Sequence, residues 1–133
     1  MKTYKSIIIF AVLISALFSC TPPGVDEQIP YVTGTINLSG GALGDGEKLY
    51  LKVASDAGFV NIKKVVLIRN EQYDFVVNLS KGSWFFKAFV DKNNDGADNS
   101  GEKYGNYGGD PPVALEITQN FQISEIEITV DMR

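Results

Sequence analysis

Apolar and polar residues alternate along most of this chain from Tyr31 onward. The alternating segments carry an apolar residue at every second position, and they cover residues 32–38, 49–53, 73–79, 84–90 and 126–130. Successive side chains on a β-strand point to opposite faces of its sheet, so this period predicts strands with one buried face and one wet face. Residues 113, 115 and 117 share an apolar face in a further predicted strand. The apolar run at residues 65–68 predicts a more fully buried strand.

Turn-forming residues separate these segments. They lie mainly at residues 40–46, 56–58, 70–72 and 81–82, and such residues favour tight turns. No segment shows the apolar spacing of an amphipathic helix. The pattern therefore predicts an all-β fold at residues 31–133: an antiparallel two-sheet sandwich of about seven strands, of the Greek-key type, with Trp84 in its core.

The N-terminal residues follow a different pattern. Lys2 and Lys5 precede an apolar stretch at residues 6–18, which is shorter than the ~20 residues that a membrane-spanning helix needs. A basic segment before a short apolar segment is typical of a signal peptide. The following Leu17-Phe18-Ser19-Cys20 resembles the lipobox of bacterial lipoproteins. This resemblance implies that residues 1–19 are removed, and that Cys20 is joined to diacylglycerol and N-acylated, for example with palmitate.

This interpretation defines a domain organisation and a location. Residues 20–30 are expected to be the lipidated cysteine and a proline-containing flexible tether, and residues 31–133 the β-sandwich domain. The anchor implies a membrane partner at the cell envelope. Thr21 rather than aspartate follows the cysteine, which resembles the outer-membrane sorting of enterobacterial lipoproteins, so the outer membrane is expected rather than the inner one. The alternative is an ordinary secretory signal with an incidental cysteine.

The amino-acid composition argues against several classes of function. The chain has 12 basic and 16 acidic residues and a net charge of −4. Removal of the signal peptide takes away two lysines and no acidic residue, which leaves −6. Such a surface repels phosphate backbones, so no nucleic-acid partner is expected. The absence of histidine excludes Ser-His catalysis and histidine-ligated zinc sites, and a single cysteine excludes a disulfide within the chain.

One segment carries a specific chemical motif. Residues 91–102 match the calcium-loop pattern D-x-[DN]-x-[DN]-G-x₅-E at every specified position. Ca²⁺ takes six to eight hard oxygen ligands, and Gly96 permits the sharp turn that brings them together. Mg²⁺ prefers a smaller and wetter site. The motif predicts side-chain or carbonyl oxygen ligands from Asp91, Asn93, Asp95, Ala97, Asn99 and Glu102.

The context of this motif is a strand rather than a helix. Residues 84–90 alternate before it, and Gly105, Gly108 and Gly109 follow it. A helix-free loop of this kind resembles those in extracellular β-domains and provides no helix pair that could open like a calcium sensor. The alternative is a turn without an ion. Four carboxylates lie within the segment, at Asp91, Asp95, Asp98 and Glu102, and their mutual repulsion favours the calcium interpretation.

Three segments also resemble a known family. Residues 32–36, 73–75 and 81–91 look like the transthyretin-like sandwich of carboxypeptidase regulatory-like domains and related bacterial surface modules. The shared pattern is an opening Gly-Thr strand and a Gly-x-aromatic strand after a tight turn. This resemblance implies a domain that binds, spaces or presents something and that is not an enzyme.

Other residues provide weaker candidates. Tyr104 and Tyr107 follow the calcium motif and could contact a protein or glycan ligand, although covering one end of the sandwich is the preferred interpretation. Phe85 and Phe89 could form an exposed stripe, but we expect a loop or strand to cover them. The favoured interpretation is a non-catalytic, calcium-stabilised module that binds a ligand or acts as a spacer at the cell envelope. The alternatives are a glycan-active enzyme that uses surface carboxylates, and a protein-binding subunit or inhibitor of an envelope complex.

Overall fold

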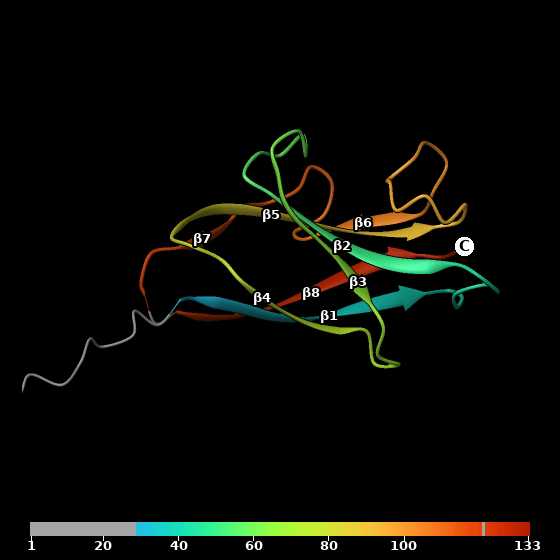
Figure 1. Ribbon diagram of the computed structural model, residues 1–133, viewed down its shortest axis with the longest axis horizontal. Helices are drawn as coiled ribbons and strands as arrows, with labels where there is room; N and C mark the ends of the chain where they lie inside the picture. Colours follow the sequence, from blue (N-terminus) through green and yellow to red (C-terminus); the bar gives the residue numbers. More distant parts are fainter. Residues whose placement is uncertain (1–28, 121) are drawn as a thin grey trace, which may run out of the picture.

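Eight β-strands form the regular structure of residues 29–120 and 122–133, which a computed structural model describes (Figure 1). They are β1 (Tyr31–Ser39), β2 (Lys48–Ala54), β3 (Ile62–Ile68), β4 (Asp74–Asn78), β5 (Gly82–Asp91), β6 (Tyr104–Asn106), β7 (Leu115–Ile117) and β8 (Ile123–Asp131). The expected signal peptide, Cys20 and all but the last two residues of the expected tether lie outside the described residues. No helix within the described ranges is long and apolar enough to cross a membrane.

The strands form two layers. One sheet has the order β4-β1-β8, and the other has the order β3-β2-β5-β6, with β7 paired to the beginning of β5. Figure 1 shows the larger sheet above the smaller one. The predicted all-β two-sheet sandwich is thus confirmed. The additional strand is β6, which the sequence pattern left within a loop because it is only three residues long.

One strand pair differs from the predicted antiparallel arrangement. β1 and β8 are parallel and stay in register from Tyr31 beside Ile123 to Ser39 beside Asp131. A two-residue hairpin requires an antiparallel pair, whereas a parallel pair requires a long connection. β1 and β8 are the first and last strands, and six other strands lie between them in the sequence. Chain connectivity therefore permits the parallel pairing.

The sandwich core follows the predicted alternation. The inward apolar side chains of β1, β2, β5 and β8 are buried, except for the half-buried Leu38 near the end of β1, and Trp84 is only 7% exposed. The indole Nε1 of Trp84 donates a hydrogen bond to the Ser80 carbonyl oxygen at 2.8 Å. Gly34 also faces the core, where a Cβ atom would lie 2.4 Å from the Phe75 ring. Phe75 is the register partner of Gly34 on the neighbouring strand β4, so glycine is required here to leave room for this ring beside β1.

β3 is less buried than the sequence pattern predicted. Its apolar run at residues 65–68 contains one buried residue, Ile68, while Val65 is 47% exposed. β3 lies at the edge of its sheet with β2 as its neighbour. An edge strand has fewer neighbours to cover its side chains, so an apolar run does not by itself indicate burial. Lys63 and Lys64 are exposed, as their charge predicts.

Candidate calcium loop

The calcium motif forms the connection between β5 and β6, hereafter the acidic loop (residues 91–102). Its course bends sharply because Asn94 and Gly96 adopt positive φ angles of 60° and 72°. Such angles are in the left-handed region, which asparagine and glycine tolerate best. The sequence therefore supplies suitable residues at both bends, and the loop folds back on itself between two paired strands.

Asp91 stands at the base of the acidic loop and is fully buried. Its Oδ2 accepts a hydrogen bond from the Gly96 backbone N–H at 2.8 Å, while its buried Oδ1 has no hydrogen-bond partner. An isolated buried carboxylate oxygen is destabilising unless a donor or cation compensates it. Asp91 is therefore the side chain whose chemistry most clearly calls for a further ligand.

The Asp95 carboxylate accepts hydrogen bonds from its neighbours in the loop. The Ala97 backbone N–H donates to its Oδ1 at 2.9 Å, and the amide groups of Asn93 and Asn99 donate to its Oδ2 at 3.0 and 2.7 Å. The Ala97 N–H, followed by the Asn99 amide, lowers the pKa of Asp95 from its ordinary value. These donors favour the ionised carboxylate, which is the form that binds a cation.

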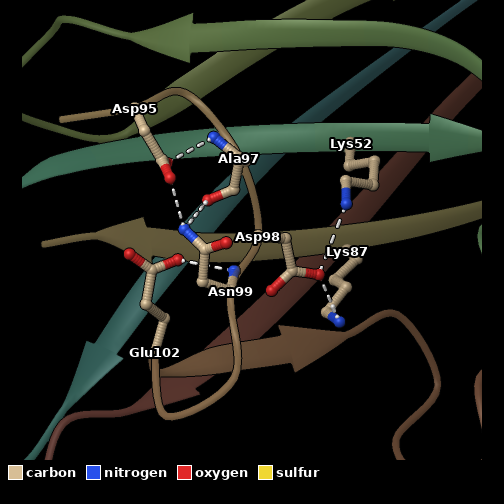
Figure 2. Close-up of polar contacts among 7 residues, drawn as sticks. All are labelled: Lys52, Lys87, Asp95, Ala97, Asp98, Asn99 and Glu102. Carbon is tan, nitrogen blue, oxygen red and sulfur yellow. Dashed lines mark hydrogen bonds and ion pairs between the residues drawn. The ribbon is translucent and has the colours of Figure 1, made fainter. Parts of the chain in front are cut away.

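Glu102 connects the two ends of the loop. Its Oε1 accepts from the Lys92 backbone N–H at 2.9 Å, and its Oε2 accepts from the Asn99 backbone N–H at 2.9 Å. Figure 2 shows the Asp95 and Glu102 carboxylates on either side of Asn99. A glutamate at the twelfth position therefore has a structural role in this loop even without an ion.

The donor set suits calcium chemically but is not arranged around one point. Within the described part of the chain, no group of three or more carboxylate, cysteine or histidine side chains could hold a metal ion. The Asn99 amide nitrogen lies 2.7 Å from Asp95 Oδ2 and 3.4 Å from the Ala97 carbonyl oxygen. Turning this amide would direct its oxygen towards the same region. All six motif ligands offer hard oxygen atoms, which is the chemistry that Ca²⁺ prefers.

Asp98 has a different role from the one that its sequence position indicated. It points out of the acidic loop towards the larger sheet (Figure 2), where its Oδ2 lies 2.6 Å from Lys87 Nζ and 3.3 Å from Lys52 Nζ. Its charge is therefore compensated by lysines, and it does not contribute to carboxylate repulsion as the sequence argument assumed. This cluster could have been found only from the strand register, in which Lys52 and Lys87 face one another across β2 and β5. Like charges in such a pair are destabilising, and a neighbouring anion compensates them.

The two candidate tyrosines lie on opposite faces of β6 and its extension. Tyr104 faces outward, is 45% exposed, and has Lys87 Nζ 4.2 Å from its ring centroid. Tyr107 packs against the core with its ring edge-on to Phe86, at a centroid distance of 6.3 Å. The expectation that tyrosines cover the sandwich is confirmed for Tyr107. Tyr104 is available at the surface.

Tyr104 borders an open hollow beside the acidic loop. The hollow has a volume of about 310 Å³ and is lined by Lys87, Tyr104 and residues 98–102. Two motif residues, Asn99 and Glu102, thus line the same space as the exposed tyrosine. The expected cover over Phe89 is also present, since this ring is 0% exposed, whereas Phe85 is half-buried.

No model of a known protein family matches this chain, and no curated protein is significantly similar to it in sequence. The resemblance to the transthyretin-like sandwich is therefore limited to the two-sheet β architecture. Such an architecture serves many unrelated functions, so any function has to be argued from the acidic loop and its surroundings.

Proposed function

We propose that this chain is a lipid-anchored, non-catalytic module of the cell envelope whose β-sandwich is stabilised by Ca²⁺ in the acidic loop. The observation that carries the proposal is the fully buried Asp91, whose Oδ1 lacks a hydrogen-bond partner. It lies at the first position of a segment that also matches the calcium motif at its other specified positions. Sequence spacing and an uncompensated buried oxygen are independent arguments for a cation.

In this proposal Asp91, Asn93 and Asp95 supply side-chain oxygens, Ala97 supplies its carbonyl, and Asn99 and Glu102 complete the ligand set. The ion would contribute positive charge among three carboxylates, at Asp91, Asp95 and Glu102. It would thereby fix the connection between β5 and β6. The hollow of about 310 Å³ beside Asn99 and Tyr104 provides space for a protein or glycan ligand.

Two observations favour binding over catalysis. Both oxygens of Glu102 accept backbone hydrogen bonds, and Asp98 is neutralised by two lysines. A glycosidase requires two carboxylates that are free to exchange protons and attack or activate water. The carboxylates nearest the hollow therefore stabilise the loop conformation. This arrangement fits a module that binds a ligand or acts as a spacer.

Calorimetric titration of the chelator-treated lipoprotein in detergent tests the calcium proposal. We expect saturable heat with Ca²⁺ and a higher melting temperature in millimolar Ca²⁺ than in Mg²⁺ at equal ionic strength, because binding to the folded state stabilises it. Asp91→Asn should abolish the response. Asp56→Asn is the matched control, since Asp56 is also hydrogen-bonded by backbone N–H groups but lies in another loop. Equal melting curves in both salts and no saturable heat would reduce the motif to an acidic turn.

The anchor requires a separate test. Cys20→Ser should move the protein from the membrane fraction to the soluble exported fraction, because two or three acyl chains give stable attachment. Mass spectrometry of the wild-type N-terminus is the direct measurement. An unmodified Cys20 in the wild-type protein would contradict the lipoprotein assignment without affecting the calcium experiment.

A further inference from the structure

Phe89 occupies a position that the strand pattern assigns to water. Its neighbours Ala88 and Val90 face the core, so Phe89 faces outward from the larger sheet, and yet it is 0% exposed. The registers place Tyr50 of β2 on one side and Tyr104 of β6 on the other. The Tyr50 and Phe89 rings stack with a centroid distance of 5.4 Å and an interplanar angle of 13°. Phe89 is thus the centre of a small apolar cluster outside the main core.

The acidic loop reaches the sheet beside this cluster through Asp98. The carboxylate binds Lys87 at 2.6 Å and Lys52 at 3.3 Å, and Lys52 Nζ lies 5.2 Å from the centroid of the Phe89 ring. The side chains of Asp98, Lys52 and Lys87 are only 13%, 16% and 17% exposed. The loop also approaches Tyr50, whose hydroxyl lies 4.0 Å from the position of a Cβ atom on Gly96.

We propose that Asp98 is a latch that couples calcium occupancy of the acidic loop to the covering of the Tyr50–Phe89 cluster. Asp98 is a positioning residue and not a metal ligand: it lies between Ala97 and Asn99 but points to the sheet (Figure 2). The inference rests on the proposed calcium site. With the ion bound, the loop holds Asp98 on the two lysines. Without the ion, the loop loosens and exposes an aromatic surface bordered by two amines.

The coupling is reciprocal. If calcium strengthens the latch, the latch strengthens calcium binding by the same factor, because both belong to one thermodynamic cycle. Loss of the Asp98 charge leaves Lys52 and Lys87 facing one another without an anion. It also leaves the loop less ordered before binding. We therefore expect Asp98→Asn to weaken calcium binding roughly tenfold, a typical coupling factor, although it removes no motif ligand.

Thiol accessibility at residue 89 tests the latch. Cys20 is the sole native cysteine and is expected to be a thioether, so Phe89→Cys introduces one reactive thiol. Calcium should slow alkylation of this thiol roughly tenfold when Asp98 is present, in line with the coupling factor, and by less than about twofold when Asp98→Asn is added. Asp98→Glu keeps the charge and should restore protection. Asp74→Asn, at a carboxylate on the outer face of the smaller sheet, should leave it unchanged.

A second measurement avoids dependence on the Phe89 substitution. Hydrogen exchange of residues 92–103 in the otherwise wild-type lipoprotein should slow with calcium, and this protection should shrink in Asp98→Asn. If calcium protects residue 89 equally with and without the Asp98→Asn substitution, the latch is overturned and the calcium proposal stays intact. Absence of saturable calcium heat in the wild type would overturn the calcium proposal itself, together with the coupling that depends on it.

Discussion

The two outer faces of the sandwich obey the same alternation but have opposite chemistry. The outward positions of the smaller sheet are mostly polar or acidic, apart from the exposed Val76 and, at one end, Ile123 beside Tyr31. Two open hollows of about 430 and 370 Å³ lie on that face. Thr35 donates a hydrogen bond to Asp74, and Asn37 donates one to Glu127. The outward positions of the larger sheet include Tyr50, Lys52, Phe85, Lys87, Phe89 and Tyr104.

This difference explains why one face carries a loop and the other does not need one. Water satisfies threonine, asparagine and glutamate side chains, so the smaller sheet can remain bare. Aromatic rings and two facing lysines leave both apolar surface and repulsive charge on the larger sheet. The acidic loop compensates the charge, because Asp98 binds both lysines, and in the proposed latch it also helps to cover Phe89. The loop is therefore structural as well as a candidate ion site.

The largest expected effect comes from the core that both sheets share. Trp84→Ala should destabilise the protein by ~3–5 kcal/mol, because the mutation removes a buried ring and leaves a cavity. The indole is 7% exposed and its Nε1 is hydrogen-bonded to the Ser80 carbonyl. Urea unfolding followed by circular dichroism measures the change. A loss below ~1 kcal/mol would show that the two sheets do not depend on this packing.

A smaller effect should separate the two outer faces. Phe89→Ala should destabilise by ~3 kcal/mol, since the buried ring behaves like a core residue. Val76→Ala is the matched substitution on the smaller sheet, where the side chain is 65% exposed, and it should change stability by less than ~0.5 kcal/mol. Equal urea midpoints for the two variants would mean that the acidic loop does not shield Phe89 in solution.

The smallest effect is a pH dependence with a contribution from each region. Hydrogen bonds from the side chain and the backbone N–H of Arg133, together with its charge, lower the pKa of Asp131, at the end of β8, from 3.8 to about 2. The pKa of Asp95 in the acidic loop is also lowered, chiefly by the Ala97 N–H. Depressed folded-state values mean that both contributions are complete above pH ~4 and disappear as pH falls through those values.

Melting temperatures between about pH 5 and about pH 2, measured with chelator present, would separate these contributions. Asp131→Asn and Asp95→Asn should each flatten part of the decrease in stability below pH ~4, and the double variant should flatten more. Both groups are exposed, so we expect small shifts that additional salt reduces. Identical acid profiles for wild type and both variants would contradict this assignment of the acid-sensitive groups.

The sequence predicted where the strands lie along the chain more reliably than which strands lie side by side in the sheets. Alternation correctly identified the inward residues of β1, β2, β4, β5 and β8, because burial on one face is a local property of each segment. The exposure of Val65 and the parallel pairing of β1 with β8 depend on which strands lie side by side. That information is non-local, and no spacing within a single segment contains it.

In the candidate site, too, the local features could be predicted from the sequence and the long-range contacts could not. Spacing alone identified the residues of the calcium motif and the sharp turn at Gly96. The role of Asp98 depends on Lys52 and Lys87, which lie 46 and 11 residues away in the sequence and meet only after β2 and β5 pair. The function of a charged residue in a loop is therefore set by the sheet beneath it as much as by the loop motif.

The position of β1 has a mechanical consequence. This first strand is the middle strand of its sheet, held by β4 on one side and along nine residues by β8 on the other. Tension applied at Tyr31 would pull β1 along its own axis and load both ladders in shear. Their hydrogen bonds would then share the force instead of opening one after another. If the domain is attached through its N-terminus, tension would therefore act on a strand that is paired on both sides.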